Sequence, residues 1–228
     1  MDRASRPILC FVIDRRSLAG ASGEGAQPLS ALGEMISRAV AAGVDWVQIR
    51  EKDLPGAALV KLTRDAVERA GGTRILVNDR LDVASAAGAA GVHLGEKSMP
   101  VESVVRWLRT LDNAARMPRN FLVGASCHSL QAALTAERAG ADYVIFGPVF
   151  ETPSKAAFGA PQGLERLEEV CRRVRIPVLA IGGVTLENAA SCISAGAGGV
   201  AAIRMFQEAR NPCEVVRDLR GTPDRGPD

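Results

Sequence analysis

The segment RAGADYVIF (residues 138–146) joins the end of a predicted helix to an apolar strand, and three other segments repeat its pattern. The repeats are AAGVDWVQ (41–48), AAGAAGVHL (86–94) and SAGAGGVAA (194–202). In each, helical sequence stops at a glycine that can form a left-handed cap, and a new strand follows. This repeated junction favours a (β/α)8 TIM barrel over a doubly wound open sheet with extra strands, which stays the alternative fold.

Short apolar runs alternate along the chain with longer segments of helical periodicity, as in a parallel sheet covered by helices. The predicted strands are Leu9–Ile13, Trp46–Arg50, Ile75–Asn78, Gly91–Leu94, Phe121–Ala125, Tyr143–Phe146, Val178–Ile181 and Gly199–Ile203. The predicted helices are Leu29–Ala42, Ala57–Ala70, Leu81–Ala87, Val101–Leu111, Leu130–Ala139, Leu164–Val174, Leu186–Ala195 and Cys213–Leu219. We therefore predict a single barrel domain over residues 1–220 and a disordered tail over residues 221–228.

Composition fits an ordinary enzyme domain: 47% of the 228 residues are hydrophobic, 24% are charged, and the net charge is +2. Seven arginines lie on helix-like stretches that also carry acids, which argues against a nucleic-acid partner. They are Arg64, Arg69, Arg106, Arg109, Arg172, Arg173 and Arg175. No apolar run suits a signal peptide or approaches the ~18 residues of a membrane span, so no membrane partner is expected. Five scattered cysteines without CxxC spacing indicate reduced thiols and a cytoplasmic location. A homo-oligomer is compatible with the sequence, which does not specify the oligomeric state.

Polar residues that follow the strands should meet at one end of the barrel, because parallel strands all run the same way. They are Gln48, Arg50, Glu51 and Lys52 after the second strand, Asn78 and Asp79 after the third, Ser126 and His128 after the fifth, Thr152, Ser154 and Lys155 after the sixth, and Gly182 and Gly183 after the seventh. Two long loops at the same end, Leu18–Pro28 and Glu151–Gly163, are candidates for segments that close over a substrate.

Gln48, Arg50 and Lys52 alternate along the chain, which can turn all three toward the barrel axis and an anion. The alternative is that Gln48 and Arg50 only satisfy the barrel interior, while Glu51 and Lys52 are surface charges. A cation at a barrel mouth needs a counter-charge to offset its desolvation, which favours the anion site.

Asn78 and Asp79 end an apolar strand, and an amide oxygen beside a carboxylate suits a hard cation such as Mg²⁺. Equally, Asp79 or Asp82 could simply cap the helix that follows. The sequence by itself does not decide between the two.

Thr152, Ser154 and Lys155 are flexible donors able to close over a diphosphate, or they form an ordinary surface loop. Gly183 and its neighbours in IGGV precede a helix start, as in the phosphate sites of barrels, although a tight turn would need the same glycines. His128 is a candidate acid or base, whereas Cys127 has no base partner in the sequence.

Seven motifs resemble, in order and spacing, the thiamine phosphate synthase family and its thiazole tautomerase relatives. They are QIREKD (48–53), LVNDRLDVA (76–84), GVHLG (91–95), GASCHS (124–129), FGPVFETPSK (146–155), PVLAIGGV (177–184) and GAGGVAAI (196–203). The resemblance covers about Leu9 to Phe206 and implies a (β/α)8 barrel. For a synthase it implies Mg²⁺-assisted coupling of 4-amino-2-methyl-5-hydroxymethylpyrimidine diphosphate to a thiazole phosphate, which gives thiamine phosphate and pyrophosphate.

Carried over by position, the resemblance implies a role for each site residue. Those on the diphosphate and pyrimidine side are Gln48, Arg50, Lys52, Asn78, Ser126 and Lys155, with Asp79 on Mg²⁺. Those around the thiazole phosphate are Thr152, Ser154, Gly183, Ile203 and Arg204. The catalytic groups would be Arg50, Lys52 and Lys155, with His128 as the proton shuttle of a tautomerase.

Two departures from the synthase pattern keep other functions open. Synthases usually carry a second aspartate ligand shortly after GVHLG, and the aligned position here is Ser98, unless Glu96 or water substitutes. FET (150–152) and the histidine of CHS resemble the tautomerases, which act on a thiazole carboxylate phosphate, whereas NDR (78–80) resembles the synthases. A third hypothesis is a non-catalytic ligand sensor on the same barrel. Unneeded charges at a barrel mouth would cost stability, which argues against it.

Overall fold

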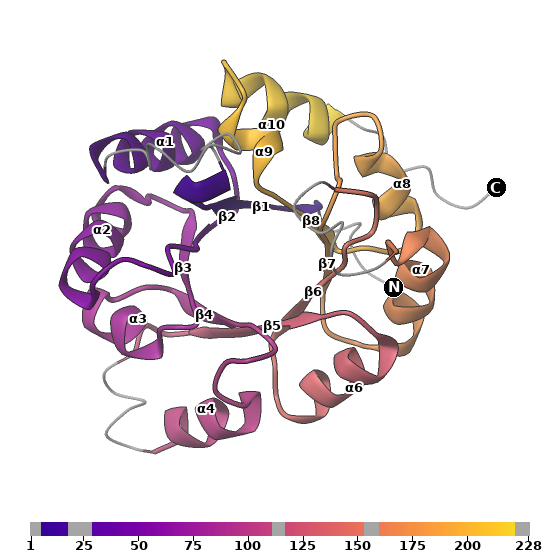
Figure 1. The fold of residues 1–228 in the computed structure, drawn as a ribbon, viewed down its shortest axis with the longest axis horizontal. Helices are drawn as coiled ribbons and strands as arrows, with labels where there is room; N and C mark the ends of the chain where they lie inside the picture. Colours follow the sequence, from indigo (N-terminus) through magenta and orange to yellow (C-terminus); the bar gives the residue numbers. More distant parts are fainter. Residues whose placement is uncertain (1–5, 18–28, 111–116, 153–159, 222–228) are drawn as a thin grey trace.

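The computed structural model describes residues 6–17, 29–110, 117–152 and 160–221. Eight parallel strands follow one another around a closed barrel in sequence order, and the last pairs with the first (Figure 1). The predicted barrel is therefore confirmed, and the open sheet is wrong.

The strands are β1 (Ile8–Ile13), β2 (Trp46–Ile49), β3 (Arg74–Asn78), β4 (Gly91–Leu94), β5 (Leu122–Cys127), β6 (Tyr143–Phe146), β7 (Val178–Ala180) and β8 (Gly199–Ala202). All were expected near these positions. The largest difference is in β5, which ends at Cys127 rather than Ala125, so that Ser126 lies on the strand and not after it.

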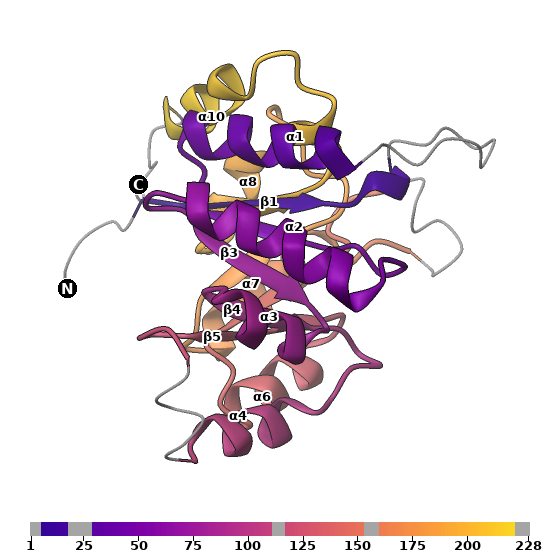
Figure 2. The same ribbon diagram turned by 90° about the vertical axis from the view of Figure 1, so that its left-hand side faces the viewer.

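The helices form the outer ring of Figure 1, and Figure 2 shows α1, α2 and α3 side by side on the barrel wall. Their bounds are α1 (Leu29–Ala42), α2 (Gly56–Arg69), α3 (Leu81–Ala87), α4 (Val101–Leu108), α6 (Leu130–Arg138), α7 (Gly163–Arg173), α8 (Ala189–Ser194), α9 (Arg204–Gln207) and α10 (Pro212–Gly221), with a 3-10 turn, η1 (Arg15–Ser17). No helix in these described ranges is both long and apolar enough to cross a membrane.

The glycine of each repeated junction has the left-handed backbone that the sequence pattern predicted. The φ angles are +87° at Gly43, +69° at Gly88, +94° at Gly140 and +91° at Gly196. Because side chains other than glycine rarely adopt this conformation, these residues end their helices and turn the chain back into the barrel.

The helix between β7 and β8 was predicted to begin at Leu186. That prediction is wrong, because this helix, α8, begins at Ala189. The intervening turn is held by the Asn188 side chain, whose Oδ1 accepts a hydrogen bond from the Thr185 N–H at 2.8 Å. Its Nδ2 donates to the Gly183 carbonyl at 2.9 Å. Local side-chain bonds of this kind compete with the first turn of a helix.

Other differences lie at the ends of elements. The helix predicted to reach Leu111 ends at Leu108, and η1 and α9 were not expected. The last helix, α10, runs to Gly221, and the remaining predicted tail, residues 222–228, lies outside the described residues. So do the predicted loop Leu18–Pro28 and residues 153–159 of the other loop.

Two apolar layers hold the barrel, and β1 shows how the strand period divides them. Leu9 and Phe11 pack outward in the large core beneath the helices, whereas Cys10 and Val12 belong to a smaller cluster inside the barrel. Tyr143 fills that interior: a Cβ on Gly124 would lie 2.0 Å from its ring. The interior is thus packed at this level, and the polar groups at the carboxyl ends of the strands lie above it.

Candidate active site

A chain of hydrogen bonds links β2 to the end of β3. Gln48 Nε2 donates to Asn78 Oδ1 at 3.0 Å, and Asn78 Nδ2 donates to Asp79 Oδ2 at 2.7 Å. Gln48 is buried, and its Oε1 has no hydrogen-bond partner among the described residues. A buried acceptor without a partner is costly unless a ligand supplies the donor, so this atom is a candidate binding position.

Asp79 is held in place from several sides. Its φ of +62° is unusual for a residue with a side chain, and its N–H donates to the His93 carbonyl at 2.8 Å. Its Oδ1 accepts hydrogen bonds from the Gly95 N–H at 3.1 Å and from the Ser98 hydroxyl. The alternative that Asp79 caps the next helix is wrong, because its carboxylate bonds Asn78, Gly95 and Ser98, and the N-cap residue of α3 is Arg80. Asp82 lies in the first turn of α3, where its carboxylate contacts the Val83 N–H and pairs with Arg80.

The side chains around Asp79 supply only part of the coordination shell that Mg²⁺ requires. The described residues contain no group of three or more histidine, cysteine, aspartate or glutamate side chains that could hold a metal ion. Mg²⁺ commonly takes one or two carboxylates and completes its shell with water and substrate phosphate oxygens. One carboxylate, Asp79, is compatible with that second arrangement.

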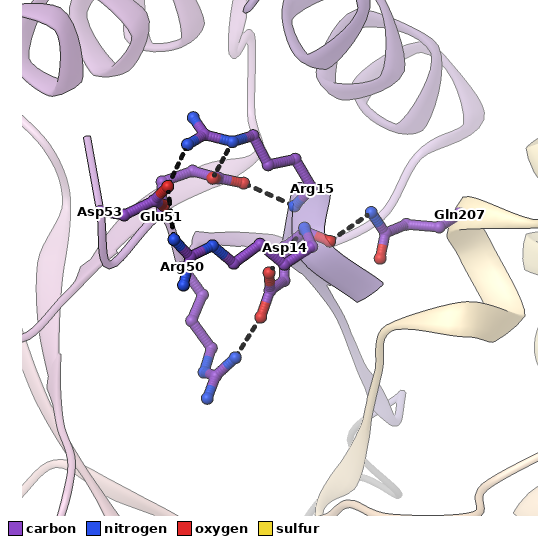
Figure 3. A network of polar contacts seen from close by, with 7 residues as sticks. Asp14, Arg15, Arg50, Glu51, Asp53 and Gln207 are labelled. Carbon is purple, nitrogen blue, oxygen red and sulfur yellow. Dashed lines mark hydrogen bonds and ion pairs between the residues drawn. The ribbon is translucent and has the colours of Figure 1, made fainter. Parts of the chain in front are cut away.

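Arg50 directly follows β2 and forms an ion pair with Asp14, which directly follows β1 (Figure 3). The side chains are 31% and 11% exposed, so water screens the pair only in part. The counter-charge that we expected from an anion is therefore supplied, in the first instance, by the protein. Asp14 was not expected at the site from the sequence, although the pairing of Ile13 with Ile49 places the residues after them side by side.

Glu51 extends toward Arg15, on the side away from the contact between Arg50 and Asp14 (Figure 3). It is 4% exposed, so its interpretation as a surface charge is wrong, whereas Lys52 is exposed. Glu51 Oε1 accepts a hydrogen bond from the Arg15 N–H at 2.7 Å, and its Oε2 lies 3.6 Å from Arg15 Nε. Burial raises the pKa of the Glu51 carboxyl above its usual range. Its contacts anchor η1 to the end of β2.

Ser126 is backed by two buried polar residues that sequence analysis did not select. His93 Nε2 lies 2.9 Å from Ser126 Oγ, and His93 Nδ1 lies 3.2 Å from the Tyr143 hydroxyl. Burial lowers the pKa of His93 to about 4, so the ring is neutral at neutral pH. The available signal was a histidine within the apolar strand sequence GVHLG.

His128 follows β5, and its Nδ1 contacts the Gly147 carbonyl. Because a carbonyl only accepts hydrogen bonds, the proton of the neutral ring is on Nδ1. Nε2 lies 3.9 Å from Glu96 Oε1. The neighbouring Cys127 is buried, which raises its pKa to about 12 and agrees with its assignment as an unreactive thiol.

The predicted thiazole phosphate residues that the structure describes follow the ends of β6, β7 and β8. Arg204 Nη2 donates to Thr152 Oγ1 at 3.0 Å. Gly183 has a φ of +66°, and a Cβ there would lie 2.5 Å from the Glu151 carbonyl oxygen. Only glycine lets these two turns approach so closely. Ile203 precedes Arg204, whereas Ser154 and Lys155 lie outside the described residues.

The family model and the sequence relatives agree on one family. The family model described as thiamine monophosphate synthase matches residues 21–206. A putative thiamine-phosphate synthase of Geobacter sulfurreducens is 44% identical over 81% of this chain and 84% of its own length. A thiamine-phosphate synthase of Chlorobium luteolum is 38% identical over 96% of this chain and 94% of its own.

A solved structure points the same way. The thiamine phosphate pyrophosphorylase of Pyrococcus furiosus superposes with a TM-score of 0.77 at 30% identity, over 95% of each chain. The match of the family model, the relatives that span nearly the whole chain and this shared barrel together show that the chain belongs to the thiamine monophosphate synthase family.

Proposed function

We propose that this protein is a thiamine-phosphate synthase, a transferase that couples the pyrimidine diphosphate to a thiazole phosphate with release of pyrophosphate. The observation that carries the proposal is the polar chain Gln48–Asn78–Asp79 at the mouth of a barrel of this family. It offers an unpartnered buried acceptor, an amide and a carboxylate within one binding position.

Cations on the diphosphate side supply the main catalytic effect in this proposal. As the bond between carbon and the leaving oxygen breaks, negative charge grows on the diphosphate. Arg50, Lys52 and Lys155 stabilise that charge more in the transition state than in the ground state, which is the condition for acceleration. Asp79 would hold Mg²⁺ together with substrate oxygens, and the bound ion supplies further positive charge beside the leaving group.

On the pyrimidine side, Gln48 Oε1 accepts a hydrogen bond from the bound aminopyrimidine, and Ser126 binds the ring with His93 behind it. Loss of the diphosphate leaves positive charge on the pyrimidine. A neutral His93 favours that charge more than a protonated ring would, because like charges repel in a site with little water. The depressed pKa of His93 therefore supports this chemistry.

On the thiazole side, Thr152, Ser154, Gly183, Ile203 and Arg204 bind the phosphate in this proposal. The bond between Arg204 and Thr152 leaves the guanidinium close to the turn at Gly183, where backbone groups approach the ligand. Holding the phosphate there places the thiazole nitrogen beside the reacting carbon, so coupling becomes effectively intramolecular.

One observation favours the tautomerase as a second candidate. His128 has Nδ1 fixed by the Gly147 carbonyl and Nε2 left as a base, the arrangement that a proton shuttle needs. We propose a cytoplasmic location for either enzyme, from the expectation that the cysteines stay reduced.

The test is to give the purified protein both substrates, with and without Mg²⁺, and to measure thiamine phosphate and pyrophosphate. The expected result is equal amounts of the two products, dependent on Mg²⁺. Turnover of thiazole carboxylate phosphate without any coupling would overturn the proposal in favour of the tautomerase. Ligand binding without turnover of either substrate would favour the sensor.

A further inference from the structure

We infer that Asp14 is a positioning residue of the coupling reaction, whose carboxylate holds the Arg50 guanidinium by one edge and aims its other donors at the leaving diphosphate. The inference rests on the proposed function. It concerns a residue that touches no substrate and acts through Arg50.

The contact between the two side chains leaves most of the guanidinium available. It joins Arg50 Nη1 to Asp14 Oδ2. Within the described part of the chain, Nη1 is the only guanidinium nitrogen of Arg50 with a hydrogen-bond partner. Arginine carries five N–H donors in a fixed plane, so the donors on Nη2 and Nε are oriented by Asp14 without being used by it.

Asp14 is itself fixed by contacts from two elements, η1 and α9. Its Oδ1 accepts a hydrogen bond from the Arg16 N–H at 3.1 Å, within η1. Its carbonyl accepts from the Ser17 N–H at 3.0 Å and from Gln207 Nε2 at 3.1 Å. Gln207 is buried and reaches Asp14 from α9, as Figure 3 shows. A carboxylate held this firmly can define the direction of a long, flexible arginine side chain.

The negative charge of Asp14 determines whether its loss should change kcat or KM. Asp14 offsets part of the positive charge of Arg50, so it does not strengthen ground-state binding of an anion. Its benefit is orientation, which matters when charge develops on the leaving oxygen. Loss of the Asp14 charge should therefore slow the chemical step and leave diphosphate binding unchanged or tighter.

Asp14→Asn removes one of the two contacts of the carboxylate, the one with Arg50, and keeps the one with the Arg16 N–H. The asparagine Oδ1 can still accept from the Arg16 N–H, but its amide NH₂ cannot accept from Arg50. We expect kcat to fall by about 10- to 100-fold, the size of effect that a misplaced catalytic group produces. KM for the diphosphate substrate should stay the same or decrease. A KM that rises while kcat stays at the wild-type value would overturn the inference.

A double-mutant cycle with Arg50→Gln tests whether Asp14 acts through Arg50. The asparagine substitution should have little further effect on kcat in the Arg50→Gln background, because the group that it positions is gone. Additive losses would show that Asp14 only supports the end of β1. Calorimetric titration with inorganic pyrophosphate gives a second readout: Asp14→Asn should bind it at least as tightly as wild type, and Arg50→Gln more weakly.

Asp45→Asn is a matched control at the amino end of the barrel. Asp45 Oδ2 also accepts from a backbone N–H, that of Leu9 at 2.7 Å, and pairs with an arginine, Arg220, at 2.6 Å. This variant should change the melting temperature and leave kcat and KM at wild-type values. If wild type makes no thiamine phosphate, the proposed function fails. If it does and Asp14→Asn has wild-type kcat, only the inference about Asp14 fails.

Discussion

The Ser98 hydroxyl donates a hydrogen bond to Oδ1 of Asp79, the carboxylate that this site offers to a cation. Ser98 Oγ also accepts from the Gly95 N–H at 2.7 Å, which directs its own proton toward Asp79. The family resemblance implied that Ser98 takes the place of a second aspartate. The contact between Ser98 and Asp79 is compatible with that alignment, and a neutral hydroxyl adds no negative charge to the site.

The protein should therefore bind Mg²⁺ weakly by itself and well together with inorganic pyrophosphate, whose oxygens supply the missing coordination. Ser98→Asp should tighten binding to the free protein by about tenfold or more, because added ligand charge raises affinity for a hard cation. Calorimetric titration of both proteins, with Ser98→Ala as the control for loss of the hydroxyl, makes the comparison. Tight binding by free wild type would indicate that another carboxylate, such as Glu96, serves as a ligand.

Acid should destabilise the protein through His93. Its pKa is about 4 in the folded protein and 6.5 in an exposed histidine. Between these values the unfolded chain takes up a proton that the folded chain does not, so stability is full above pH 6.5 and falls as the pH drops toward 4. The loss should be on the order of 3 kcal/mol of unfolding free energy.

Urea unfolding near neutral pH and near pH 4, in wild type and His93→Gln, measures this contribution. Glutamine does not titrate, and the carboxylates contribute equally to both proteins, so the difference between the two pH dependences belongs to His93. Identical dependences would mean that the buried ring is not held neutral.

Lys155 lies outside the described residues, and its role rests on the family resemblance. Lys155→Ala should weaken binding of the diphosphate substrate and slow the chemical step, because the ammonium that the resemblance assigns to the diphosphate neutralises the charge that grows on the leaving group. Steady-state and single-turnover kinetics separate the two effects. Wild-type kinetics in this variant would favour the alternative that Thr152, Ser154 and Lys155 form an ordinary surface loop.

Local signals explain what the sequence predicted well. Gly43, Gly88, Gly140 and Gly196 each stop a helix through their own backbone freedom, so the barrel follows from short-range patterns. Asn78 and Asp79 were likewise predictable, because they end an apolar strand whose direction fixes which end of the barrel they reach.

Contacts between neighbouring strands were not predictable from such local patterns. The pairing of Asp14 with Arg50 depends on the register between β1 and β2, which a single sequence does not specify. His93 was hidden because a buried strand of a parallel barrel has no polar face to mark an inward side chain. The four-residue helix α9, which carries Gln207, is too short to show a helical period.

The two candidate enzymes differ in which residue each cannot lose. A synthase needs a carboxylate beside its leaving diphosphate, so Asp79→Asn should remove most coupling activity, while His128→Ala should keep a substantial fraction. A tautomerase has no leaving group and needs a proton shuttle, so the order should invert. Loss of a general acid or base costs ~100- to 10,000-fold, which separates the two outcomes in a steady-state assay. We expect the synthase order.

The Asp79 substitution keeps an acceptor for the Gly95 N–H, so the fold should survive it. If His128→Ala abolishes turnover while Asp79→Asn is nearly silent, the base at Nε2 of His128 performs the reaction and the protein is a tautomerase.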